Sequence, residues 1–257
     1  MSGIKVEKQG HVAVVTITNP PANTWTEESL TRLAQEVESL NDDRDIFALV
    51  LTGEGEKFFS AGADLNMFAS GDKGVASTLA HVFGKAFTAL ANFRGVSIAA
   101  INGYAMGGGL EAAMACDIRI IESQAQVALP EAKVGLLPCG LGTQTLTRLV
   151  GEPWAKRLIL CGERIGADKA LEIGLVEEVT ETGNAFAAAM TLAEQVADQS
   201  PVSVASSKRL IQATRSTSME DALYRERESF VELFDYDDTT EGVNAFLEKR
   251  KPNWKNQ

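Results

Sequence analysis

Histidine is scarce in this sequence of 257 residues, which contains only His11 and His81. Two isolated histidines are too few for most histidine-rich metal sites, and they do not favour a Ser-His-Asp triad. We therefore expect no metal centre. Any proton transfer must use another kind of side chain, and carboxylic acids are the abundant alternative.

Cysteine is also rare. The cysteines Cys116, Cys139 and Cys161 are odd in number and lie more than twenty residues apart. Such a dispersed set fits neither a disulfide framework nor a zinc knuckle. We expect these thiols to be reduced, as they are in the cytoplasm.

Long apolar runs are missing as well. Residues 95–110 carry no charge, but this stretch is shorter than the roughly 20 residues that a membrane-spanning helix needs. The N-terminal sequence MSGIKVEKQGHVAVV has no basic segment followed by a long apolar stretch and a cleavage site. We therefore expect a cytoplasmic protein that does not associate with membranes.

Positive charge is in deficit, with 24 Lys and Arg against 35 Asp and Glu and a formal net charge of −11. This balance, with a pI of about 4.8, argues against nucleic acid as a partner. Apolar residues make up 45% of the chain, which is ordinary for a globular protein with a substantial core.

The first part of the chain alternates between strand-like and helix-like patterns. β-Branched or continuous apolar runs predict strands at residues 11–18, 46–51, 96–101, 118–121 and 127–129. Three- and four-residue spacing of apolar residues predicts a helix after Thr26, which can cap it, and another helix occupies much of residues 75–92.

Helical patterns dominate the rest of the chain. The predicted helices cover residues 154–160, 167–173, 184–197, 202–213, 219–234 and 241–249. We interpret residues 1–195 as an α/β core and residues 196–257 as a helical region, with the pair Ser200-Pro201 close to the boundary.

The segment NGYAMGGGLE, residues 102–111, is the most informative one. Its three successive glycines follow a buried strand and open a helix, where backbone N–H groups lack partners and can bind an anion. Glu111 is the only charged residue between Gly95 and Cys116, so burial should raise the pKa of its carboxyl group. A tightly packed turn with a solvated glutamate is the alternative interpretation.

Two further segments have similar features. In FFSAGADL, residues 58–65, small residues expose backbone donors, and Asp64 suits a turn or a helix cap better than catalysis. In PEAKVGLLPCGLGTQ, residues 130–144, Glu131 follows a proline at a predicted helix start. Taken alone, Glu131 is typical of an exposed residue that complements the helix dipole.

These three segments, in this order and spacing, resemble the crotonase (enoyl-CoA hydratase/isomerase) superfamily, and the C-terminal FLEKRKPNW is similar too. The resemblance covers essentially the whole chain. It implies a crotonase-like spiral of ββα turns followed by a C-terminal helical oligomerisation region, and a homotrimer or a dimer of trimers. It also implies an acyl-CoA thioester substrate, with no cofactor beyond the coenzyme A that the substrate carries.

The resemblance also implies roles for individual residues. The backbone N–H groups of Ala63 and Gly108 would form an oxyanion hole for the thioester oxygen. Glu111 would be the main base toward water, and Glu131 would donate a proton to C2, although this division is open. The remaining substrate-binding positions that it implies are Ala61, Asp64, Leu65, Gly107, Cys139 and Lys249, with Lys249 reaching coenzyme A from a neighbouring subunit.

The chain departs from the family pattern at two places. Many relatives have P-G-x-G-G where this chain has Pro138-Cys139-Gly140-Leu141-Gly142, and many hydratases have lysine at the position of Asn66. By resemblance the Cys139 N–H would help to hold the catalytic water, while its thiol is expected to be inert packing. The run Lys249-Arg250-Lys251 is also typical of charged side chains that are simply exposed to solvent.

The sequence thus predicts an enoyl-CoA hydratase that adds water across the C2=C3 bond of a 2-trans-enoyl-CoA. A 3-enoyl to 2-enoyl-CoA isomerase, or another acyl-CoA enzyme of the same fold, is the nearest alternative. Related isomerases often keep only one of the two glutamates, so the pair favours hydration. A non-catalytic RNA-binding or scaffold member is the alternative from another class, which the acidic composition disfavours.

Overall fold

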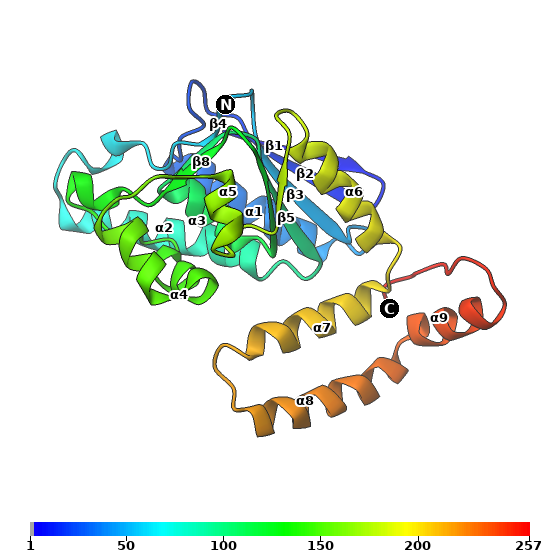
Figure 1. Cartoon of the computed structure of the whole chain (residues 1–257). Helices are drawn as coiled ribbons and strands as arrows, with labels where there is room; N and C mark the ends of the chain where they lie inside the picture. Colours follow the sequence, from blue (N-terminus) through cyan, green and yellow to red (C-terminus); the bar gives the residue numbers. More distant parts are fainter. Residues whose placement is uncertain (1–2) are drawn as a thin grey trace.

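The computed structural model describes residues 3–257, which form two β-sheets, a set of surrounding helices and a C-terminal helical extension (Figure 1). The larger sheet has six strands in the order β1-β2-β3-β5-β7-β10. Only the β1–β2 pair is antiparallel in it. Its strands are β1 (Ile4–Gln9), β2 (Val12–Ile17), β3 (Ala48–Gly53), β5 (Val96–Ile101), β7 (Ile118–Glu122) and β10 (Glu178–Thr180).

The smaller sheet has four strands in the order β4-β6-β8-β9. These strands are β4 (Phe58–Ser60), β6 (Tyr104–Met106), β8 (Gln126–Ala128) and β9 (Ile165–Gly166). Each of the pairs β3–β4, β5–β6 and β7–β8 gives one strand to each sheet, and a helix follows each pair. This arrangement is the repeated ββα turn that the resemblance implies.

The helices of the core are α1 (Glu27–Asp42), α2 (Lys73–Ala91), α3 (Gly108–Ala115), α4 (Gly142–Leu160), α5 (Ala167–Glu172) and α6 (Ala185–Ala197). Two short 3-10 helices, η1 (Leu65–Phe68) and η2 (Glu131–Val134), precede α2 and α4. As expected, Thr26 caps α1: its hydroxyl accepts from the Ser29 N–H, and the Ser29 hydroxyl accepts in return from the Thr26 N–H.

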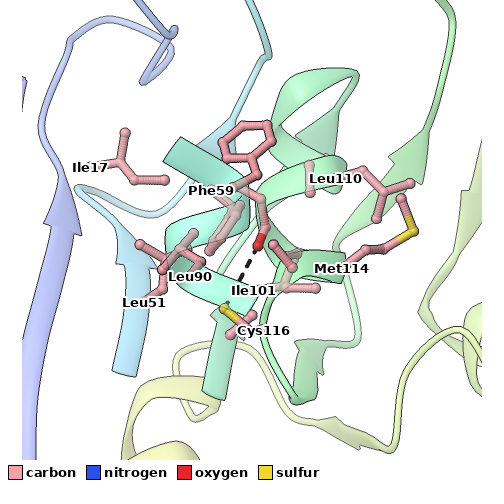
Figure 2. Packing of buried hydrophobic residues seen from close by; sticks show 14 of the residues in the cluster. Ile17, Leu51, Phe59, Leu90, Ile101, Leu110, Met114 and Cys116 are labelled. Atoms are coloured by element: carbon pink, nitrogen blue, oxygen red, sulfur yellow. Dashed lines mark hydrogen bonds between the residues drawn. The ribbon is translucent and has the colours of Figure 1, made fainter. Parts of the chain in front are cut away.

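The larger sheet is covered on both faces, as its continuous apolar strands predict. In β3, Leu49 and Leu51 face the main core, while Ala48 and Val50 face a second cluster that includes Ala189 of α6. Figure 2 shows the main core, in which Leu110 and Met114 of α3 lie among side chains of the sheets and of α2. Helix α3 is therefore buried along its whole length.

The C-terminal helices α7 (Pro201–Ala213), α8 (Met219–Glu232) and α9 (Asp237–Leu247), with the short η3 (Leu233–Asp235), lie outside the layered core in Figure 1. Ser200 caps α7 and Pro201 occupies its first turn. Lys208 ties α7 to the core through an ion pair with Asp117, with Nζ and Oδ2 2.6 Å apart. The proposed division into residues 1–195 and 196–257 stays a prediction.

Some elements differ from the sequence-based expectations. Strand β1 was not predicted, although Ile4 and Val6 alternate with charged residues. Helix α4 consists of two segments, because Gly151 leaves the helical conformation with φ 75°. The second segment contains the predicted helix at residues 154–160, and the first, which begins at Gly142, was not predicted. No helix within residues 3–257 is both long and apolar enough to span a membrane.

Candidate active site

Glu111 lies in the most buried helix of the described chain. Strand β6 leads into α3 through Gly107, which has φ 52°, and Glu111 follows in the first turn of the helix. Its side chain is 2% exposed, and its neighbours on α3 are apolar. The sequence-based expectation of a buried glutamate after the glycines is therefore confirmed.

The Glu111 carboxylate rests in a cradle of backbone donors. The N–H groups of Gly140 and Gly142 both donate to Oε1, with N–O distances of 2.9 and 2.7 Å. Burial raises the pKa of Glu111, and these two hydrogen bonds oppose that shift because they favour the charged form. One oxygen is thus held by the protein, while Oε2 accepts no hydrogen bond from the residues that the structure describes.

The cradle depends on its local backbone. A Cβ at Gly142 would lie 2.8 Å from Glu111 Oε1, and one at Gly140 would lie 2.4 Å from the Phe87 ring. Between them Leu141 has φ 122°, a conformation that side chains rarely adopt and that typically costs about 1–3 kcal/mol. This strained turn directs the N–H groups on either side of Leu141 toward one oxygen of the Glu111 carboxylate.

Glu131 is the second glutamate of the predicted pair, and it is partly buried. It opens η2 directly after Pro130. Both of its carboxyl oxygens are buried and have no hydrogen-bond partner within residues 3–257. Burial raises the pKa of Glu131 to about 7; its own backbone N–H opposes this shift, and the charge of Glu111 adds to it.

The two glutamates belong to one site. Glu131 Oε1 lies 3.1 Å from the position that a Cβ on Gly107 would occupy, so its carboxyl group faces the start of the helix that carries Glu111. At neutral pH about half of the Glu131 carboxyl groups are protonated, while two backbone hydrogen bonds favour the charged form of Glu111. Such a pair can take a proton at one place and give one at another.

The backbone N–H groups of Ala63 and Gly108 lie close together. A Cβ on Gly62 would lie 3.3 Å from the Gly108 nitrogen and 2.7 Å from the Met106 oxygen, so only glycine allows the two segments to approach. Neither N–H has a hydrogen-bond partner in the described part of the chain. Gly108 is the first residue of α3, where no intrahelical partner exists.

Trp25 explains the orientation of Ala63. The Trp25 N–H donates to the Gly62 oxygen at 2.8 Å, and the Asp64 N–H donates to the Trp25 oxygen at 2.9 Å. Both bonds of this parallel bridge use the backbone groups of Trp25, so the N–H of Ala63 is directed away from it. Two backbone donors without partners in the described residues thus lie near each other, and one of them, Gly108, directly follows the Gly107 that Glu131 faces.

The other residues of the FFSAGADL segment shape the loop around Ala63. The Ala61 N–H donates to the Ala22 oxygen at 2.9 Å. Asp64 caps η1 by accepting from the N–H and the side-chain amide of Asn66, as its turn-forming character indicates. Leu65 begins η1 and is half exposed.

Two of the predicted substrate-binding residues, Cys139 and Lys249, differ from the others in exposure and position. Cys139 is exposed, so the expectation that its thiol is packed was wrong, because Pro138 and Gly140 take the buried positions on either side. The pKa of that thiol is raised to about 11, chiefly by partial burial and then by the two glutamates, which keeps it protonated. Lys249 follows α9 with φ 55°, and Figure 1 shows α9 outside the layered core that contains α3.

The sequence analysis missed the residues that hold Glu111 and the residue that pairs with Ala63. Gly140 and Gly142 could have been recognised from the glycines of the PCGLG segment, whereas nothing local to Trp25 indicates that its backbone pairs with Ala63. Residues 3–257 contain no cluster of three or more His, Cys, Asp or Glu side chains arranged to hold a metal ion.

Comparisons with known proteins agree with this architecture. The family model described as enoyl-CoA hydratase/isomerase matches residues 7–257. The short-chain-enoyl-CoA hydratase of Clostridium acetobutylicum is 38% identical, with 98% of this chain and 97% of that protein covered. The probable enoyl-CoA hydratase of Bacillus subtilis is 39% identical over the full length of both proteins.

A solved structure of DspI from Pseudomonas aeruginosa is 63% identical and superposes with a TM-score of 0.96, covering 99% of this chain and 97% of that one. The relatives named as hydratases are hydro-lyases, and the solved structures of such enzymes share this mixed α/β fold. The crotonase-like fold predicted from the sequence is therefore confirmed, and the chain belongs to the enoyl-CoA hydratase/isomerase family.

Proposed function

We propose that the protein is an enoyl-CoA hydratase that adds water across the C2=C3 bond of a 2-trans-enoyl-CoA and yields a 3-hydroxyacyl-CoA. The observation that carries this proposal is the pair of buried glutamates beside two unpaired backbone donors. Glu111 is held by Gly140 and Gly142, and Glu131 has a pKa raised to about 7. The names of the relatives support the same activity.

The first requirement of this reaction is stabilisation of negative charge on the thioester oxygen. When water adds to C3, electrons move through the double bond and an enolate forms. The N–H groups of Ala63 and Gly108 are fixed before the reaction begins, so they stabilise the enolate oxygen without reorganisation. Loss of one such donor typically lowers the rate by about 100- to 1,000-fold.

The second requirement is a pair of proton transfers. The Glu111 carboxylate accepts a proton from the water whose oxygen bonds to C3, and its unpaired Oε2 is the atom available for that water. The Glu131 carboxyl group then gives its proton to C2, which restores the thioester carbonyl. The proton that Glu111 gains returns to Glu131 through solvent or the water of the site before the next turnover.

An isomerase is the second candidate, since the family model covers both activities. In that reaction Glu131 alone would remove a proton from one carbon and return it to another, and no water would add. The backbone cradle around Glu111 favours the hydratase, because two glycine donors that hold a second carboxylate have no function in a single-acid proton shuttle.

Hydration is tested by mixing the purified protein with crotonyl-CoA and following the absorbance of the conjugated enoyl thioester. We expect the absorbance to fall, and we expect Glu111→Gln and Glu131→Gln each to lower the rate by about two orders of magnitude or more. A wild-type protein that is inactive on enoyl-CoAs of several chain lengths would refute the hydratase. Loss of activity only in Glu131→Gln, with 3-enoyl-CoA as the better substrate, would establish the isomerase.

The partners and location follow from the same proposal. We infer that the enzyme uses no metal or cofactor apart from the coenzyme A of its substrate, and that it acts in the cytoplasm. We also infer a trimer or a dimer of trimers, built through α7–α9, in which Lys249 of one subunit meets the coenzyme A bound by another. A gel-shift assay tests the RNA-binding alternative, and because binding to nucleic acid depends on salt, it is run at a defined salt concentration. Absence of a shift would exclude that alternative.

A further inference from the structure

Trp25 carries a buried polar group whose partner is missing. The side chain is 0% exposed, and its indole Nε1–H has no hydrogen-bond acceptor among the residues that the structure describes. A buried donor without a partner typically costs about 1–3 kcal/mol, and buried tryptophans usually satisfy this group. A phenylalanine would fill an apolar core position without that cost.

The Trp25 ring lies next to the proposed oxyanion hole. The ring carbon Cδ1, which is bonded to Nε1, lies 3.2 Å from the position that a Cβ on Gly108 would take. The backbone of the same residue bonds to Gly62 and Asp64 on either side of Ala63. Trp25 therefore lies next to Gly108 with its ring and next to Ala63 with its backbone, and none of the three N–H groups has a partner within residues 3–257.

The surroundings of the ring restrict what can satisfy this N–H. The Phe87 ring packs edge-on against Trp25 with centroids 5.8 Å apart, and Phe83 contacts the same face of Gly108. These neighbours are apolar and offer no acceptor. Because Ala63 and Gly108 also present only donors there, the group that completes this region is an acceptor with negative charge or strong polarity.

We propose that the indole N–H of Trp25 donates a hydrogen bond to the thioester oxygen of the bound enoyl-CoA, as a third donor beside Ala63 and Gly108. This inference rests on the proposed function. An enolate oxygen has three lone pairs, whereas the ground-state carbonyl oxygen has two, so the third donor gains most as charge develops. Trp25 then affects the rate of the chemical step more than the affinity for substrate.

The kinetic test compares Trp25→Phe, which keeps an aromatic ring but removes the N–H, with Trp154→Phe. Trp154 lies on α4, stacked with Arg157, and serves as the matched control. We expect Trp25→Phe to lower kcat for crotonyl-CoA hydration by about 10- to 100-fold, the loss typical of one hydrogen bond to a charged group, with KM nearly unchanged. Unchanged kcat in a folded Trp25→Phe protein would overturn the proposal.

A second measurement does not depend on the folding of that variant. The chain has only three tryptophans, so Trp154→Phe and Trp254→Phe assign two of the indole N–H signals in a ¹⁵N-correlated NMR spectrum, and the third belongs to Trp25. We expect butyryl-CoA, a saturated thioester that cannot be hydrated, to move the Trp25 indole proton downfield.

The outcomes of this titration separate the two proposals. If butyryl-CoA shifts backbone signals of the glycine-rich segments but leaves the Trp25 indole signal in place, the third donor is refuted and the proposed function stands. If only a thioester with an additional oxygen on its acyl chain moves the Trp25 signal, the thioester oxygen is not its acceptor. If butyryl-CoA moves no signal, the proposed function fails as well.

Discussion

At the scale of single residues, Glu111 and Glu131 have the same side chain in two different environments. Glu111 loses water but gains two backbone donors, while Glu131 loses water and gains no partner within the described residues. The burial of Glu111 could be predicted, because no other charge lies between Gly95 and Cys116. Burial of Glu131 could not, since a glutamate after a proline at a helix start is usually exposed.

The first prediction at this scale concerns the pH dependence of activity. Because Glu131 must be protonated and its pKa is about 7, kcat/KM should fall as the pH rises through about 7. It should also fall at acidic pH, where Glu111 becomes protonated. Rates measured between pH 5 and pH 9 test this, and a high-pH decline that persists unchanged in Glu131→Gln would contradict the role of Glu131.

The second prediction concerns stability. The pKa of Glu131 is about 7 in the folded protein and near its usual value when unfolded, so the folded state binds more protons between these values and the free energy of unfolding falls as pH rises. Glu131→Gln removes this penalty. We expect its melting temperature to exceed that of the wild type at pH 8 but not at pH 4.5.

The control for this comparison is Glu56→Gln, because Glu56 is exposed between β3 and β4 and makes no ion pair or side-chain hydrogen bond with the described residues. We expect it to leave the pH dependence of the melting temperature unchanged. Equal melting temperatures of wild type and Glu131→Gln at pH 8 would show that the Glu131 carboxyl group is not buried.

At the scale of secondary-structure elements, the long buried strands could be predicted, and so could the short β8 from its apolar run at residues 127–129, whereas other short strands could not. Strand β5 spans the predicted residues 96–101, because six consecutive apolar or small residues suit a strand covered on both faces. Strands β4, β6 and β9 have two or three residues each, and they form only because each pairs with a distant segment. The backbone cradle at Gly140 and Gly142 also depends on such long-range contacts.

The third prediction tests this cradle. The Cβ of Gly142→Ala would lie 2.8 Å from Glu111 Oε1 and 2.7 Å from the Cβ of Pro138, so both the carboxylate and the start of α4 must move. We expect kcat to fall by about tenfold or more and the free energy of unfolding to fall by about 1–3 kcal/mol, as for other overpacked sites. Steady-state kinetics and urea unfolding measure the two effects.

Gly84→Ala is the matched control, because it makes the same change in α2 where no atom lies within 4 Å of the added methyl group. We expect unchanged kcat and a gain of up to about 1 kcal/mol in stability, since alanine favours a helix over glycine. Wild-type activity in Gly142→Ala would show that the cradle does not position Glu111.

At the scale of the whole molecule, the C-terminal helices carry more exposed apolar side chains than a free surface usually does. Phe246 is 83% exposed, and the other strongly exposed apolar side chains are Ile211, Met219, Tyr224, Phe230, Val231, Phe234 and Leu247. The helical pattern of residues 196–257 was predictable from apolar spacing. The surface that covers these side chains was not predictable, because apolar residues have the same spacing in a helix that faces another subunit and in one that faces its own core.

The fourth prediction is that this surface is buried between subunits. We expect light scattering after size-exclusion chromatography to give three or six times the mass of one chain. Phe246→Ser should shift the protein toward smaller species, while Phe246→Leu, which keeps an apolar side chain, should not. A wild-type monomer that hydrates crotonyl-CoA at full rate would contradict an oligomer that completes the site.

We propose that Glu111 and Glu131 together add one water molecule to an enoyl thioester. Mass spectrometry of the product formed from crotonyl-CoA in H₂¹⁸O tests it most directly. We expect a product heavier than the substrate by one molecule of H₂¹⁸O, with its label on C3, and no such product from the Glu111→Gln/Glu131→Gln double variant. A product without label, or equal labelling by that variant, would contradict it.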